Sequence, residues 1–373
     1  MKFVVSYPQT NWEYVKFRLN RIIQGKDKSN DVFRGLPGGK LELFEHSGEL
    51  GGIKSLGELH PVKPFGLQYV AGEGLYFITG LTCSECGVSG DEHIARLNEN
   101  GEIDLEIRSP LLTQVRALRR TERGLLVTAC GVDALLEFNL SGELIWSWWA
   151  TEHGYDQAYG GGTRVIDKTM DHRLRIYPGC LQTTHLNSAI VDPYDNGKVL
   201  TILFYQGKVA RIDRETLKTD IVITDLNGAH HIRPHSKGYM LSNSRKGEVL
   251  IFDKNFQLIE TIAGTNRYFP VKWVQDAIET PFGTHLIADC NTFKLRERDA
   301  NGKEKSYNTK IPNRAFQIEP VADNFNFIPC AVDSSRKTPL AFPRGHPTAP
   351  PACGSSRPAA PAGRRRGTSS NIQ

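Results

Sequence analysis

One pattern recurs six times along this chain: an alternating apolar run, a short polar turn and a second alternating run. The turns centre on Gly48, Gly101, Gly142, Thr216, Phe256 and Gly302, at spacings of 53, 41, 74, 40 and 46 residues. Period-two alternation around Asn-Gly or Ser-Gly turns is typical of β-hairpins. Hairpins that repeat about every forty residues are the signature of a β-propeller.

A second column of residues gives the same count. A short apolar strand precedes each hairpin and carries one polar residue. These residues are Gln68, Arg116, Asn187, His231, Asp276 and Gln317, at spacings of 48, 71, 44, 45 and 41. We therefore predict an all-β fold, a six-bladed propeller in which this strand opens each blade and lines the central channel.

The two ends of the chain complement each other. Residues 39–55 supply only an outer hairpin, and residues 314–331 supply an opening strand with room for one neighbour. Joined, they make a composite sixth blade that closes the ring and leaves no open edge. We therefore predict an N-terminal extension over 1–38, a propeller over 39–332, and a disordered tail over 333–373 that is rich in Pro, Ala and Arg.

Composition limits the class of protein. The chain is 39% hydrophobic and 23% charged, with no apolar run near the length of a membrane span and no secretory signal at its start. The chain has a net charge of +5. The segment from residue 333 onward has seven Lys or Arg and one Asp, a net charge of +6, so the propeller itself has a net charge of about −1. A neutral body lacks the basic footprint of nucleic-acid binding. We expect a cytoplasmic monomer without nucleic-acid or membrane partners.

Seven cysteines are scattered along the chain. Cys83 and Cys86 form a lone C-x-x-C, and no second pair stands at the spacing of a zinc site. We expect a reduced protein whose thiols are mostly small buried side chains.

The polar residues of the opening strands predict a ring around one axial pocket. Because strand side chains alternate, we expect His185 and Asn187 to share a face, and His231 rather than His230 to point inward. Over thirty residues separate Trp149 from the strand expected near Thr183. Loops of that length are often functional, so we predict a lid that carries His153, Tyr155 or Arg164 over the channel.

Three stretches between residues 131 and 253 resemble the arylsulfotransferase-like propeller family. They begin GVDALLEFNL, THLNSAIVDP and GAHHIRPHSK, and the most specific piece is the H-x-N-S of His185–Ser188. The resemblance implies that His185 and Asn187 orient a sulfuryl group while His231 attacks it. The arginine that the family carries on the following strand is absent, so Arg116 or Arg245 would replace it.

Three functions follow as alternatives. The first is a sulfotransferase-like enzyme of small-molecule or secondary metabolism that needs no cofactor. Its catalytic residues would be His231, His185, Asn187 and Arg116, and its substrate-binding residues Gln68, Asp276, Gln317, His153, Arg164 and Arg245. The second is a metal-dependent hydrolase or lyase with one divalent ion in the channel, held by His185, Asn187, His231 and Asp276. The third is a non-catalytic propeller that binds a partner protein.

Overall fold

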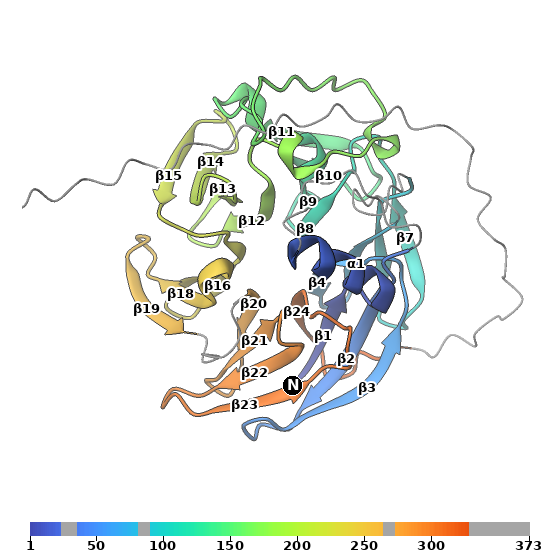
Figure 1. Cartoon of the computed structure of the whole chain (residues 1–373), viewed down its shortest axis with the longest axis vertical. Coiled ribbons are helices and arrows are strands. Elements are labelled where there is room, and N and C mark those ends of the chain that lie inside the picture. The colour runs from blue at the N-terminus through green and yellow to red at the C-terminus, as the bar shows by residue number, and fades with distance from the viewer. Residues whose placement is uncertain (24–35, 81–89, 264–272, 328–373) are drawn as a thin grey trace, which may run out of the picture.

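Six four-stranded antiparallel sheets surround a common axis (Figure 1). The computed structural model describes residues 1–23, 36–80, 90–263 and 273–327. Within these ranges the fold is an all-β, six-bladed propeller, as predicted, and it also has one α-helix, α1 (Trp12–Ile23). The tail predicted to be disordered and the C-x-x-C of Cys83 and Cys86 lie outside the described residues.

Five blades are built from four consecutive strands, ordered from the axis outwards. The second blade of the ring holds β4 (Phe65–Val70), β5 (Gly74–Thr79), β6 (His93–Leu97) and β7 (Ile103–Ile107). The third holds β8 (Val115–Arg120), β9 (Leu125–Ala129), β10 (Ala134–Phe138) and β11 (Leu144–Trp149). The fourth holds β12 (Leu186–Asp192), β13 (Asp195–Leu203), β14 (Lys208–Asp213) and β15 (Thr219–Ile223).

The remaining consecutive blades follow the same order. The fifth holds β16 (His230–His235), β17 (Gly238–Asn243), β18 (Glu248–Phe252) and β19 (Leu258–Ala263). The sixth holds β20 (Val274–Glu279), β21 (His285–Asp289), β22 (Lys294–Arg298) and β23 (Glu304–Asn308). Short 3-10 turns lie between strands: η1 (Cys130–Val132), η2 (Ala150–Glu152), η3 (His172–Leu174), η4 (Gly179–Leu181) and η5 (Ser244–Lys246).

The first blade is composite, with the order β24 (Gln317–Val321), β1 (Lys2–Tyr7), β2 (Lys40–His46) and β3 (Ile53–Leu59). Closure by both ends of the chain is therefore confirmed, but the boundary at residue 39 is not. β1 pairs with β24 on one side and β2 on the other, so residues 2–7 belong to the propeller. Phe3, Val4 and Val5 are consecutive apolar residues, because both faces of β1 are buried, and a test for alternation misses such a strand.

The recurring hairpin is the outer pair of strands in every blade, and its turn has a local cause. In four blades an Asn or Asp three residues before the turn position accepts hydrogen bonds from the N–H groups two and four residues after it, as Asn98 does from Asn100 and Glu102 at 2.9 and 3.0 Å. Asn139, Asp253 and Asp299 repeat this arrangement. The turn residue that follows takes a positive φ, such as +75° at Gly101, which favours glycine.

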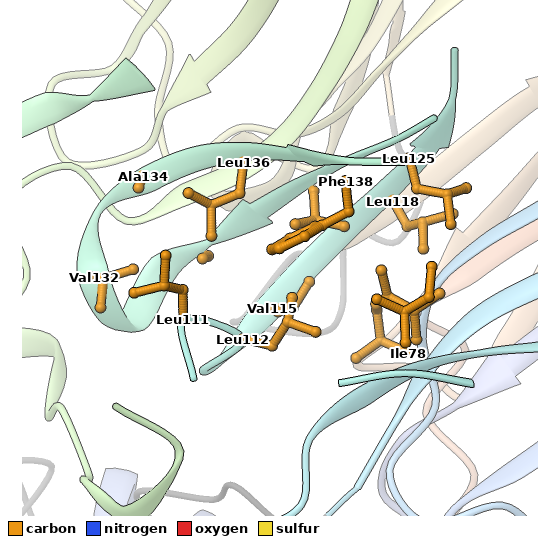
Figure 2. Packing of buried hydrophobic residues seen from close by; sticks show 14 of the residues in the cluster. Ile78, Leu111, Leu112, Val115, Leu118, Leu125, Val132, Ala134, Leu136 and Phe138 are labelled. Atoms are coloured by element: carbon orange, nitrogen blue, oxygen red, sulfur yellow. The ribbon is translucent and has the colours of Figure 1, made fainter. Parts of the chain in front are cut away.

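Apolar side chains fill the spaces between neighbouring blades. Figure 2 shows one such cluster, in which Leu118, Leu125, Leu136 and Phe138 of the third blade pack toward Ile78 of the second. All five side chains are at most 1% exposed. This packing holds the inner strands rigidly in place around the axis.

Two further findings concern expectations from the sequence. No helix among the described residues has the length and apolar character that crossing a membrane requires. Cys130 and Cys290 are buried thiols outside any disulfide, as expected, but Cys180 is disulfide-bonded, so the expectation of a reduced protein is wrong.

Candidate functional site

The six inner strands begin at one end of the propeller axis, and we call this end the mouth. Side chains from all six blades gather there, at the start of an inner strand or at the end of the strand beside it. They are Phe65, Arg116, His185, Phe204, Tyr205, His230, His231, Arg245, Trp273 and Phe316. We call this group the axial cluster.

One side of the axial cluster is a chain of ring contacts. The guanidinium of Arg116 lies 5.0 Å from the ring centroid of Phe65, and Phe65 meets Phe316 edge to face at 4.6 Å. Phe316 in turn meets the imidazole of His231 at 5.4 Å. An aromatic surface therefore joins a cation to an imidazole.

The other side continues from His231 to the fourth blade. The rings of His231 and His230 lie 6.4 Å apart, and His230 contacts Trp273 at 5.4 Å and Phe204 at 5.3 Å. Phe204 also contacts His185 at 5.1 Å. The exposed Arg245 lies 5.2 Å above the ring of Phe204, so this side also ends in a cation.

Hydrogen bonds set the tautomer of the imidazoles. Nδ1 of His231 lies 2.8 Å from the carbonyl oxygen of Gln275, and Nδ1 of His230 lies 3.0 Å from that of Gly228. A carbonyl oxygen can only accept, so Nδ1 carries the proton in both rings and Nε2 has a bare lone pair. Nε2 of His231 is buried and makes no hydrogen bond to a described residue.

Burial keeps these imidazoles neutral. It lowers the pKa of His185 to about 3, with smaller contributions from the charges of Arg116 and Arg245. Burial also lowers the pKa of His230 and of His231, although the carboxylate of Asp276 opposes the shift in His231. A neutral imidazole with a bare Nε2 can act as a nucleophile or a general base.

The backbone at the mouth departs from a regular strand. Five inner strands begin with a β-bulge, where the pairing with the neighbouring strand shifts. His185 and His231 have φ values of +50° and +41°, which residues other than glycine seldom adopt. Such strain persists where the surrounding structure enforces it, often at functional sites.

Buried carboxyl groups hold this backbone. Asp133 accepts hydrogen bonds from the N–H groups of Thr183, Thr184 and His185 at 2.8 to 3.1 Å, and its charge is paired with Arg164. Glu92 accepts from the N–H groups of Gln114 and Val115 at 2.8 and 2.6 Å. Burial raises the pKa of Glu92. Arg164, predicted to bind substrate, therefore pairs with the carboxylate that positions His185.

The bulges also explain why the predicted polar column does not lie at one level. By strand register, Arg116, Asn187 and His231 occupy equivalent positions in their blades, whereas Asp276 comes one position later and Gln68 two. At a bulge, two consecutive residues oppose one residue of the partner strand, so simple alternation fails. The expectation that His230 points away from His231 is wrong for this reason, since both rings belong to the axial cluster.

Below the mouth, Gln68, Asp276 and Gln317 make hydrogen bonds along and between strands. Gln317 receives the N–H of Leu67 at 2.8 Å and donates to its carbonyl at 2.6 Å, which joins the first blade to the second. Oε1 of Gln68 accepts the N–H of Arg120 at 2.5 Å.

The carboxylate of Asp276 is saturated. Its two oxygens receive the Nε and Nη2 donors of Arg233 at 2.9 and 2.7 Å. The same two oxygens also receive the N–H groups of Ala277 and Ile318 at 2.9 and 2.8 Å. Asp276 therefore has no lone pair left for a metal ion. Within the described residues, no three His, Cys, Asp or Glu side chains gather to hold one.

The insertion between β11 and β12 touches the axial cluster through residues other than those predicted. His153 stacks on Trp148 at 5.3 Å, and Tyr155 lies near the same indole at 6.3 Å. The insertion instead reaches the cluster through Tyr159, stacked on Tyr205 at 4.3 Å, and through Gln182, whose side-chain oxygen accepts from Nδ1 of His185. Asn187, finally, donates its amide to the carbonyl of Ala229 at 3.2 Å.

The sequence prediction missed His230 and the aromatic members of the axial cluster. Phe65, Trp273 and Phe316 stand within one to three residues of a predicted polar position, as Phe204 and Tyr205 stand directly after a strand. An aromatic residue at each of these points was the available signal. An open cleft at the other end of the axis, lined by Met1, Glu279, Thr280 and Pro320 among others, contains none of these residues.

Comparison with known proteins identifies the fold. No protein-family model matches the sequence, and no curated protein matches it either. Among solved structures, the nidogen/laminin complex matches at a TM-score of 0.55 and 11% identity, over 86% of this chain and 98% of that chain. A protein of unknown function from Bacteroides caccae matches at 0.54 and 11%, over 86% and 99%. Virginiamycin B lyase from Staphylococcus aureus matches at 0.45 and 10%, over 67% and 71%.

These similarities, at 10 to 11% identity, concern the propeller fold alone. None of the three proteins is described as an arylsulfotransferase. The resemblance to that family, carried by the H-x-N-S of His185–Ser188, therefore stays a prediction.

Proposed function

We propose that this propeller is an enzyme that acts on a small anionic aryl compound at the mouth, in an arylsulfotransferase-like transfer of a sulfuryl or related anionic group. The observation that carries the proposal is the state of His231. Its Nδ1–H is held by the carbonyl of Gln275 at 2.8 Å, and its Nε2 is buried without a hydrogen bond to a described residue. A bare imidazole nitrogen held in one orientation is what a covalent nucleophile requires.

In the proposed reaction, the Nε2 lone pair attacks the sulfur of an aryl sulfate. The S–O bond to the aryl group breaks, and the aryl oxide leaves with the bonding pair. A phenol oxygen then attacks the N-sulfo group, the N–S bond breaks, and its pair returns to Nε2. The phenol proton passes to the aryl oxide through solvent. The Gln275 carbonyl stabilises the positive charge on the ring between the two steps.

The surroundings of His231 support a substrate of this class. Arg116 and Arg245 supply positive charge to the axial cluster, and both lie near enough to His185 to lower its pKa. Positive charge of this kind stabilises the oxygens of a sulfuryl group. Phe65, Phe316 and Trp273 offer flat apolar faces for an aryl ring. The cluster therefore combines an anion-attracting and an aryl-binding surface around one imidazole.

The test is sulfuryl transfer from 4-nitrophenyl sulfate to phenol. The rate is measured from the release of the coloured 4-nitrophenol. The variant His231→Ala should lose about a thousand-fold or more of the rate, because no other group can form the N-sulfo intermediate. Arg116→Met should raise KM more than it lowers kcat. As a control, His60→Ala replaces an exposed histidine and should keep the wild-type rate.

The wild-type protein must also yield a sulfuryl-histidine adduct in mass spectrometry when the acceptor is left out, and His231→Ala must not. Turnover that survives in His231→Ala would contradict the proposed mechanism. Wild-type protein that shows neither turnover nor an adduct with aryl sulfates would contradict the substrate class.

A further inference from the structure

Below the mouth, the axis contains a second group of charged side chains that the proposed transfer does not use. Arg233 is its centre: Nε and Nη2 bind Asp276, Nη1 reaches Glu319 at 3.2 Å, and Nη2 also donates to the carbonyl of Ile318 at 2.5 Å. The guanidinium of Arg233 therefore has partners on all three of its nitrogens.

Arg119 lies on β8, three residues after Arg116, and its hydrogen bonds differ from those of Arg233. Arg119 is 8% exposed. It makes two hydrogen bonds to described residues, both donated by Nη1: one to the carbonyl of Leu67 at 2.9 Å and one to the carbonyl of Leu118 at 3.1 Å. It forms no ion pair with a described residue. The Nε–Nη2 edge, with three N–H donors, therefore has no described partner.

This edge is the one that arginine uses to bind oxyanions. Two parallel N–H groups match two oxygens of a carboxylate, a sulfate or a phosphate. Arg233 shows the match within this protein, because its Nε and Nη2 hold the two oxygens of Asp276. Arg119 presents the same edge, and no side-chain carboxylate among the described residues occupies it.

Nearby carboxylates are already engaged. Asp276 accepts four hydrogen bonds, and Glu319 accepts from Arg233 and from the N–H of Tyr69 at 3.1 Å. Burial, together with a smaller effect from the charge of Arg233, lowers the pKa of Arg119 to about 10, against the opposing effect of Glu319 and Asp276. A buried cation without a contacting counter-ion is costly, so it is usually paired.

Charge along the axis also favours an anion. At the mouth, the charges of Arg164 and Asp133 cancel each other. Apart from that pair, four guanidinium groups lie at the axis and the mouth, on Arg116, Arg119, Arg233 and Arg245. Against these stand three carboxyl groups, on Glu92, Asp276 and Glu319. With the imidazoles neutral, four positive groups against three acids leave one excess positive charge, in a propeller whose net charge is near −1.

We propose that the axis of this propeller binds a small oxyanion of the sulfate or phosphate class, held by the Nε–Nη2 edge of Arg119. The inference does not depend on the proposed transfer, since it rests on Arg119 rather than on His231. The two sites are nevertheless close enough for the charge of Arg119 to lower the pKa of His231. The oxyanion is either a free inorganic ion or the anionic group of a bound substrate.

The experiment measures binding of inorganic sulfate to the full chain by calorimetry and thermal unfolding, in buffer free of sulfate and phosphate. Sodium chloride keeps the ionic strength constant. Wild-type protein should bind one sulfate, and its melting temperature should rise by about 3 °C or more at a hundred-fold excess over Kd. Arg119→Met should weaken sulfate binding at least ten-fold.

Two further variants keep the test decisive. Arg120→Met removes the next residue on the strand, a guanidinium paired with Glu73 at 3.0 Å, and should leave sulfate affinity unchanged. Arg119→Lys keeps the charge but not the fork, and should bind sulfate several-fold more weakly than wild type. It answers the question even if Arg119→Met does not fold. That failure is not expected, because Gln317 still donates to the Leu67 carbonyl.

The source of the oxyanion is decided by competition. If 4-nitrophenyl sulfate displaces sulfate from His231→Ala while 4-nitrophenol does not, the site accepts the anionic group of an aryl sulfate. If neither displaces it, the ligand is a free inorganic oxyanion. The proposal is overturned if wild type shows no saturable sulfate binding, or if Arg119→Met or Arg119→Lys binds sulfate as tightly as wild type. It is also overturned if His231→Ala loses sulfate binding, or if chloride stabilises as much as sulfate.

Discussion

The two ends of the inner strands use the same residue types in opposite ways. At the far end, Arg120 pairs with Glu73 at 3.0 Å, and His235 shares a hydrogen bond with His285 at 3.2 Å. Asp192 accepts from Nε of Arg211 at 2.8 Å and from the hydroxyl of Tyr239 at 2.7 Å. At the mouth, Arg116 and His231 each keep a buried nitrogen without a hydrogen bond to a described residue.

This difference separates groups that hold the fold from groups that are available to a ligand. A buried polar atom without a partner lowers stability, and it persists where something other than stability selects it. The backbone under the mouth is nevertheless anchored as firmly as the far end, by Asp133 and Glu92. The mouth therefore combines a rigid support with unpaired side chains, which is the arrangement that a binding or catalytic site needs.

The largest expected effect concerns that support. Asp133→Ala should lower the free energy of unfolding by about 3–5 kcal/mol, because Arg164 and several N–H donors would be left buried without an acceptor. Urea denaturation at neutral pH measures the loss. Asp104→Ala, which removes a partly exposed partner of Arg96, should cost less than about 1 kcal/mol. A loss below about 1 kcal/mol in Asp133→Ala would show that the mouth is not anchored in this way.

A pair of variants tests the comparison directly. Asp192→Ala at the far end should lower the free energy of unfolding by about 2–3 kcal/mol, somewhat less than a fully buried pair, because Arg211 is 30% exposed. Arg116→Met at the mouth should change it by no more than about 1 kcal/mol, since Arg116 forms no ion pair with a described residue. Thermal or urea unfolding of both variants decides the matter. Equal losses at the two ends would remove the distinction between them.

The pH dependence of stability provides a smaller effect. Because the pKa of His185 is about 3 in the folded chain and near 6.5 when unfolded, the unfolded state binds more protons between these values. Stability should therefore fall as pH drops below about 6.5, by up to about 1.4 kcal/mol per pH unit for this group. Between pH 8 and pH 5, His185→Phe should lose about 1–2 kcal/mol less than wild type.

The same measurement has a control in the exposed His60. His60→Gln should follow the wild-type pH profile, because its ring is open to solvent. If His185→Phe and wild type lose stability in parallel from pH 8 to pH 5, then His185 is not held neutral by burial at the mouth.

The smallest expected effect is that of a chelator. The carboxylate of Asp276 is saturated by hydrogen bonds, and no group of metal-binding side chains forms within the described ranges. Dialysis against EDTA should leave the melting temperature within about 1 °C and sulfuryl transfer unchanged. Loss of either one, restored by a divalent ion, would instead support the metal-dependent hydrolase or lyase.

The sequence by itself determines the number of blades and the way in which the ring closes. Both depend on local physics: in four blades an Asn or Asp side chain caps the hairpin turn, as at Asn98, and alternation marks half-buried strands. It also places Arg116, His185 and His231 near the axis, because each opens a blade. The alternation pattern does not reveal strand β1, since a strand buried on both faces carries apolar residues at consecutive positions, here Phe3, Val4 and Val5.

Which side chains meet at the mouth was decided by the tertiary structure. A β-bulge leaves little trace in the sequence pattern, yet it shifts the following residues by one position along the strand. The bulges therefore place the rings of His230 and His231 in the same cluster and set Asp276 below them. The sequence of one strand likewise does not show which ion pairs its side chains form with other blades. Arg116, Arg119 and Arg120 are close neighbours in sequence, but within the described part of the chain only Arg120 meets a carboxylate at ion-pair distance, because Glu73 of the neighbouring blade lies beside it. Neighbours that come from other blades determine whether a charge is paired, and sequence spacing does not contain that information.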